Sequence, residues 1–282
     1  MKRKKVTTLL TAALAFTMTV CGSSTAIAAS ELTAESKPAT QYTIDANQEV
    51  YALLDFEDTT EFENATKGLL ASPDTLDICD ENGKVVWSQT AYAFLDQDAP
   101  DTANPSLWRD TQLNHIYGLF EVTDGIYQVR GYDMSNITFI KGDTGWIVVD
   151  PLMSVECAQA ALALVEENLG TFPVKAVIYS HSHVDHFGGV RGIISEEDVQ
   201  SGDVQVIAPE GFEKHAVSEN IYAGTAMGRR ASYQYGTMLE GGETGSLAIG
   251  IGMGQSKCRT SYISPTLRRG WHRPLQRFIH QM

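Results

Sequence analysis

Four residues with metal-binding side chains lie within six consecutive positions, directly after a predicted buried strand at residues 174–179. They are His181, His183, Asp185 and His186. On extended backbone, side chains two positions apart point to the same side, so the first two histidines can bind one ion. The aspartate and the last histidine lie in the turn beyond and can reach a second ion. Imidazole and carboxylate are good zinc ligands, so the run predicts a two-metal site.

Two such metals can share a bridging hydroxide, which is a nucleophile at neutral pH. The expected catalytic group is therefore this hydroxide, and the sequence identifies no catalytic or substrate-binding side chain. Gly188 and Gly189 follow the run and let the backbone pass close to the site. The alternative is a polar loop whose histidines bind no metal. Three of the chain's seven histidines fall in this run, and that density favours the metal site.

The flanking sequence predicts an α/β fold. Residues 118–149 consist of short strands separated by glycine-containing turns, which indicates an antiparallel meander. A buried helix is predicted from the N-cap Ser154 to about Leu169. A short helix, a strand at residues 204–207 and a helix beginning near Pro209 follow the histidine run. This order is half of an αββα sandwich, in which helices cover both faces of two packed sheets.

The N-terminus is typical of a secretory signal peptide at residues 1–28. Basic residues come first, an apolar stretch at residues 6–20 follows, and Ala26-Ile27-Ala28 fits cleavage before Ala29. A membrane anchor is the alternative, but roughly 15 apolar residues are short for a span. We expect a secreted, periplasmic protein without a membrane span after cleavage.

Charge is unevenly distributed along the chain. The formal net charge is −14, and all 35 acidic residues lie between Glu31 and Glu243. The acidic charge of residues 31–243 argues against nucleic acid as a partner. It does not exclude small anionic substrates, because a bound metal pair can reverse the local field. From about Lys257 the sequence becomes basic and arginine-rich.

Several sequence stretches resemble a known family. The histidine run with its trailing glycines, after a meander that ends in Val-Asp-Pro, resembles the metallo-β-lactamase superfamily. Four longer stretches resemble the secreted alkyl sulfatases, which hydrolyse sulfate esters such as dodecyl sulfate. These stretches are residues 104–109, 125–131, 179–192 and 216–224, and the likeness runs from about residue 55 to about residue 256.

The resemblance implies specific roles for the site residues. His181 and His183 would bind one zinc ion, and Asp185 and His186 would bind the other. An aspartate such as Asp150 usually braces the histidine loop from a second shell in this superfamily. The alternative for this aspartate is a plain turn residue before a proline.

The sequence also departs from the family pattern. Family members are about twice as long, add two glutamates and a histidine from downstream as ligands, and carry dimerisation and sterol-carrier-like domains. Here four of the seven ligands are encoded, so we expect weak metal binding or one ion only, with little or no sulfatase activity. Dimerisation is not inferred, because the family's dimerisation region is absent. The sandwich is expected to contain its N-terminal half to two-thirds, with the second half incomplete.

The resulting division of the chain is as follows. We expect a signal peptide at 1–28 and an extension packed on the main domain at 29–105, with a helical stretch around residues 50–71. An incomplete metallo-β-lactamase-like domain at 106–256 and an anomalous basic tail at 257–282 follow. The tail reads as disordered or as the result of a lost reading frame, and a genuine basic tail for an anionic surface is the alternative.

The predicted function is zinc-dependent hydrolysis of small-molecule primary alkyl sulfates, impaired by truncation. A lactone or β-lactam hydrolase and a non-catalytic remnant are the alternatives. Two further sets of residues are candidates for a role in the site. His215 is a weaker candidate ligand, and Arg229-Arg230 could hold sulfate or form structural ion pairs.

Overall fold

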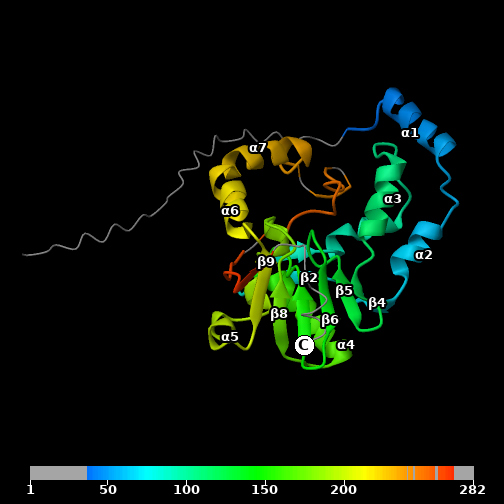
Figure 1. Ribbon diagram of the computed structural model, residues 1–282. Coiled ribbons are helices and arrows are strands. Elements are labelled where there is room, and N and C mark those ends of the chain that lie inside the picture. The colour runs from blue at the N-terminus through cyan, green and yellow to red at the C-terminus, as the bar shows by residue number, and fades with distance from the viewer. Residues whose placement is uncertain (1–36, 240, 244, 258–259, 270–282) are drawn as a thin grey trace, which may run out of the picture. The chain divides into compact units, whose positions relative to one another are not determined.

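A mixed β-sheet forms the centre of the protein in the computed structural model, which describes residues 37–239, 241–243, 245–257 and 260–269 (Figure 1). The predicted signal peptide at residues 1–28 lies outside these residues. The strand order among them is β1-β4-β5-β6-β7-β8-β9-β10. The bounds are β1 (Leu69–Ala71), β4 (Gly118–Thr123), β5 (Ile126–Arg130), β6 (Ile137–Lys141), β7 (Trp146–Val149), β8 (Val174–Ile178), β9 (Gln205–Pro209) and β10 (Leu267–Arg269).

The sheet changes direction at the strand that precedes the histidine run. Strands β4 to β7 pair antiparallel, which confirms the predicted meander. The pairs β7–β8, β8–β9 and β9–β10 are parallel. A separate two-stranded sheet is formed by β2 (Asp77–Cys79) and β3 (Val85–Ser88). The α/β class is confirmed, and the described residues form one eight-stranded and one two-stranded sheet.

Helix α4 (Val155–Leu169) connects the two parallel strands β7 and β8 and fills the core. Its N-cap Ser154 accepts a hydrogen bond from the Cys157 amide at 3.3 Å, and Gly170 ends it at φ 90°. The inward side chains Cys157, Ala158 and Val165 are fully buried. The predicted helix bounds are therefore confirmed.

The prediction of one helical stretch over residues 50–71 is wrong. The structure has α1 (Gln41–Leu53), α2 (Thr60–Thr66) and then strand β1. Gly68 breaks the helical path with φ +78°, and β1 pairs antiparallel with β4. The predicted extension therefore contributes a strand to the main sheet. It continues through the 3₁₀ helix η1 (Thr90–Asp96) and α3 (Pro105–Asn114).

The segments after the histidine run are mostly short helices. They are the 3₁₀ helices η2 (Val184–His186) and η3 (Val190–Gly192), α5 (Glu196–Ser201), α6 (Phe212–Val217), the π-helix η4 (Ser218–Tyr222) and α7 (Gly224–Gln234). The last three follow one another in an arc beyond the end of β9 (Figure 1). None of the described helices is both long and apolar enough to cross a membrane.

Part of the predicted basic tail lies on the domain. The Tyr179 hydroxyl donates a hydrogen bond to the Ile263 carbonyl at 3.1 Å, and the Ser261 hydroxyl donates to the Gly188 carbonyl at 2.9 Å. Strand β10 extends the sheet beside β9. The expected disorder therefore does not hold for residues 260–269, and the lost reading frame stays a prediction.

Candidate metal centre

The predicted ligand run begins where β8 ends. Tyr179, the first residue after the strand, is fully buried, and its ring packs 5.8 Å from Phe187 and 5.3 Å from Phe212. This aromatic anchor fixes the chain on both sides of residues 180–186, because Phe187 directly follows them. The loop is therefore held at each end while its polar side chains face away from the core.

The structure brings the four predicted ligands together. The ring centroid of His181 lies 4.7 Å from that of His183 and 4.0 Å from that of His186. The Asp185 Oδ2 atom lies 3.1 Å from His186 Nε2. The Asp185 carbonyl also accepts a hydrogen bond from the Ser135 hydroxyl, which ties this turn to the loop after β5.

Asp150 makes hydrogen bonds to two parts of the loop from the end of β7. Its Oδ2 atom accepts from His186 Nδ1 at 2.8 Å and from the Ser180 hydroxyl at 2.6 Å, and Oδ1 accepts from the Ser180 amide at 2.7 Å. The Ser180 hydroxyl in turn lies 2.9 Å from His181 Nδ1. The backbone of Asp150 has φ 55°, a conformation that aspartate tolerates better than most residues. This is the geometry that a second-shell residue needs, and its role toward a metal stays a prediction.

The local environment sets different protonation states for His186 and His181. Burial alone would lower the pKa of His186, but hydrogen bonds to Asp150 and Asp185 outweigh it and raise the pKa to about 9. Burial opposes ionisation of Asp185, and the hydrogen bond from His186 overcomes this and lowers its pKa. Burial and the neighbouring rings lower the pKa of His181. At neutral pH, His186 is thus a cation between two carboxylates, and His181 is neutral.

The types of side chain in the run suit a metal ion. Their positions in the structure do not form a complete ion site. Three imidazoles and a carboxylate are a suitable ligand set, and Asp150 orients His186 so that Nε2 faces Asp185. Yet among the residues that the structure describes, no three His, Cys, Asp or Glu side chains form a group that could hold one ion. Asp185 and His186 are hydrogen bonded to each other. A metal ion would have to replace that hydrogen bond and release a proton.

The raised pKa of His186 predicts a pH-dependent stability. The folded chain binds this proton more tightly than the unfolded chain, so the stabilisation is complete below about pH 6.5 and is lost as pH rises through about 9. We expect a loss of about 3 kcal/mol across this interval. Urea unfolding with a metal chelator, at a series of pH values, measures it. Asp150→Asn should flatten the decline, and an equal decline in both proteins would contradict the assignment.

The other candidate residues predicted from the sequence are exposed in the structure. His215 is exposed on α6, and Arg229 and Arg230 are exposed on α7. No ion pair of these arginines occurs within the described part of the chain, so the structural ion-pair interpretation is not observed.

Two acidic residues near the loop were missed from the sequence. Glu219 in η4 lies with Oε1 3.1 Å from His183 Nε2. Asp133 is 4% exposed and accepts hydrogen bonds from the Ser154 amide and from the amide and hydroxyl of Ser256. Neither follows a motif with metal-ligand spacing, so only contacts in the folded chain reveal them.

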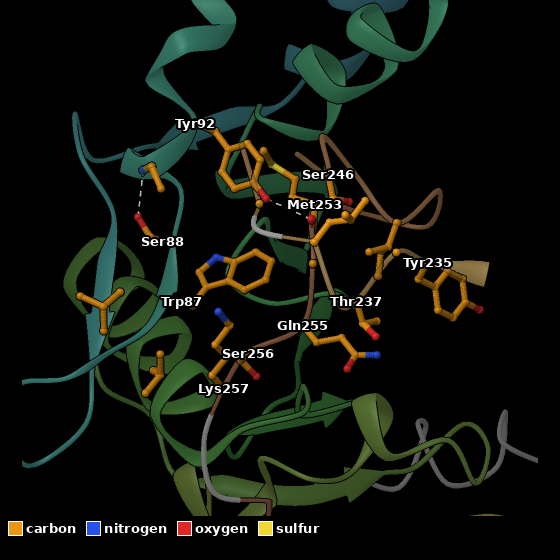
Figure 2. Close-up of a pocket in the computed structure, with 18 residues that line it drawn as sticks. Trp87, Ser88, Tyr92, Tyr235, Thr237, Ser246, Met253, Gln255, Ser256 and Lys257 are labelled. Atoms are coloured by element: carbon orange, nitrogen blue, oxygen red, sulfur yellow. Dashed lines mark hydrogen bonds between the residues drawn. The ribbon is translucent and has the colours of Figure 1, made fainter. Parts of the chain in front are cut away.

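A cavity of about 430 Å³ lies beside the segment 253–257 (Figure 2). Trp87 and Tyr92 line one side, and Tyr235 and Met253 belong to the opposite segments. The Tyr92 hydroxyl donates a hydrogen bond to the Met253 carbonyl at 3.2 Å. None of the four predicted ligands lines the cavity. Asp133 relates the cavity to the predicted ligand run. It accepts a hydrogen bond from Ser256, which lines the cavity, and Ser135, two residues later, donates to the Asp185 carbonyl.

Comparison with known proteins identifies the domain. Residues 130–254 match the family model of the metallo-beta-lactamase superfamily. These residues therefore form a domain of the metallo-beta-lactamase superfamily. Its relatives include a linear primary-alkylsulfatase of Pseudomonas sp., 50% identical over 82% of this chain and 35% of the relative. An alkyl/aryl-sulfatase of Saccharomyces cerevisiae is 48% identical over 80% of this chain and 35% of its own length.

A solved structure supports the same family at the level of the fold. The stereoselective inverting sec-alkylsulfatase of Pseudomonas sp. superposes with a TM-score of 0.78 at 49% identity, over 83% of this chain and 37% of that one. The fold of this alkylsulfatase structure is therefore shared over most of this chain. The matched part of the chain spans about a third of the length of these relatives.

Proposed function

We propose that this chain carries the metal-binding part of a zinc-dependent hydrolase of primary alkyl sulfate esters. The observation that supports this most is the convergence of His181, His183 and His186 after the end of β8. The chain is 50% identical to a linear primary-alkylsulfatase over 82% of its length. His181 and His183 would hold one zinc ion. Asp185 and His186 would contribute to the second. When bound, the zinc ions supply positive charge that polarises the ester and makes water a nucleophile at neutral pH.

The chain's own residues prepare the site in this proposal. Asp150 holds the His186 ring and, through Ser180, the His181 ring, so that less ordering is needed when an ion binds. The cavity in Figure 2 has the size of a small-molecule site and aromatic walls from Trp87 and Tyr92, which suit an alkyl chain. The secreted, periplasmic location rests on the predicted signal peptide at residues 1–28 and belongs to the proposal.

The choice of primary over secondary esters is also part of the proposal. A linear primary-alkylsulfatase and an (R)-specific secondary-alkylsulfatase of Pseudomonas sp. are 50% and 52% identical to this chain, so sequence similarity supports both types. Release of sulfate from dodecyl sulfate and from a secondary octyl sulfate distinguishes them. A panel that includes a lactone and a β-lactam distinguishes the other hydrolytic activities of the superfamily.

We expect the chain with added zinc to release sulfate slowly from dodecyl sulfate, because no three His, Cys, Asp or Glu side chains of the described residues form a group that could hold one ion. A chelator should abolish the release, and Asp185→Ala should reduce it to the level of buffer. Sulfate is measured directly, since a sulfatase must produce it whatever the alcohol. Rapid turnover with two tightly held ions would contradict the expected impairment. Release that survives both the chelator and the substitution would refute the proposed function.

A further inference from the structure

Glu219 contacts the predicted ligand His183 from a different part of the chain. Its Oε1 atom lies 3.1 Å from His183 Nε2, although 36 residues separate the two in the sequence. The Glu219 side chain is 23% exposed, and that of His183 is 57% exposed. The carboxylate is therefore the more enclosed partner. Glu219 lies in η4, between helices α6 and α7, and contacts the histidine cluster at His183.

The backbone at Glu219 is a π-helix, η4, inserted between α6 and α7. A π-turn adds a residue to the helical path and occurs often at functional sites. In this arc the irregular turn, rather than either regular helix, carries the residue that meets the histidine loop. The π-helix between α6 and α7 therefore determines the position of Glu219.

Each of the three histidines has a ring nitrogen close to a polar partner. Asp150 accepts from Nδ1 of His186, whose Nε2 lies 3.1 Å from Asp185. The Ser180 hydroxyl lies 2.9 Å from Nδ1 of His181, which leaves Nε2 of that ring for a ligand. His183 differs, because its Nε2 faces Glu219. The hydrogen bond at one nitrogen of a histidine determines which nitrogen carries the proton and which can bind a metal.

We propose that Glu219 is a positioning residue for His183, which it holds in the tautomer that presents Nδ1 to a metal ion. The Nε2–H group donates to the carboxylate, and Nδ1 keeps its lone pair. The two nitrogens point in different directions from the ring, so Glu219 acts on the metal through His183 and does not share its ion. The use of that ion in catalysis rests on the proposed function, but the tautomer does not.

The tautomer can be measured in the metal-free chain from the nitrogen chemical shifts of the His183 ring. We expect the Nε2–H form in the wild type and in Glu219→Gln, because the amide oxygen still accepts the hydrogen bond. Glu219→Ala and Glu219→Lys should lose this preference, since neither side chain accepts. Glu197→Gln, on exposed α5, is the matched control. Thermal melts verify that each variant is folded.

Cobalt affinity gives the second readout. Loss of such an outer-shell partner weakens metal binding about 10- to 100-fold, and we expect this for Glu219→Ala and Glu219→Lys, with Glu219→Gln within about 3-fold of the wild type. Unchanged tautomer and affinity in Glu219→Ala would overturn the proposal. An equal loss in Glu219→Gln would also overturn it and indicate direct ligation. If sulfate release is absent while the tautomer responds as expected, only the proposed function fails.

Discussion

Alanine at Gly189 is expected to destabilise the chain by about 3 kcal/mol or more. A Cβ atom there would lie 2.2 Å from the Pro151 carbonyl oxygen and 2.5 Å from that of Ser154. Both neighbours are backbone atoms and have no side-chain freedom with which to retreat. The Gly189 amide also donates to the Leu152 carbonyl at 2.9 Å, so the two segments cannot simply separate.

Urea unfolding of Gly189→Ala beside Gly228→Ala measures this effect. Gly228 lies within α7, and a Cβ atom there meets nothing within 4 Å. Alanine at Gly228 should therefore raise stability by about 0.5–1 kcal/mol, through its better helix propensity. If both variants unfold at the wild-type urea concentration, the close approach of the two segments is not a constraint on the fold.

The same close approach explains why this glycine could be predicted from the sequence. The histidine run had to leave a buried strand and turn sharply, and two glycines directly afterwards indicated a tight passage. The structure places that passage against residues 151–154, between Asp150 and helix α4. The meander and α4 were equally accessible, because turn residues, caps and apolar periodicity are local signals.

Contacts between distant residues were not accessible from the sequence. Glu219 belongs to a segment noticed only for its family resemblance, and its contact with His183 depends on the path of the helical arc. Asp133 bonds Ser256, 123 positions later, and a lone aspartate after a strand carries no sign of such a partner. Strand β1 was predicted as helix, because three residues are too few to show a periodic pattern of hydrophobic side chains. The pairing with β4 decides their conformation.

The four predicted ligands could be named from the sequence because they occupy one short loop. Their spacing alone predicted that they would gather, and the ring distances agree with it. The spacing did not reveal that Asp185 and His186 bond to each other in the absence of metal. Burial opposes the charged forms of both side chains, and the hydrogen bonds of His186 with Asp150 and Asp185 outweigh it. Protons and metal ions therefore compete for the same atoms.

The substitution with the largest expected effect on metal binding is the double change His181→Ala and His183→Ala. It removes both imidazoles of one predicted ion and leaves Asp150, Asp185 and His186 in place. We expect the remaining pair to lose at least about 100-fold in zinc affinity, because two nitrogen ligands are lost together. Both rings are exposed, so the fold should keep its stability in the chelated state.

Zinc titration of the 282-residue chain by calorimetry, beside this double variant, tests the central claim most directly. The claim is that residues 181–186 are the metal-binding run of an alkylsulfatase-type domain. We predict that the wild type binds zinc weakly or takes up one ion, with release of protons, and that the double variant loses this binding. Equal zinc binding by the two proteins, or none by the wild type, would contradict the claim.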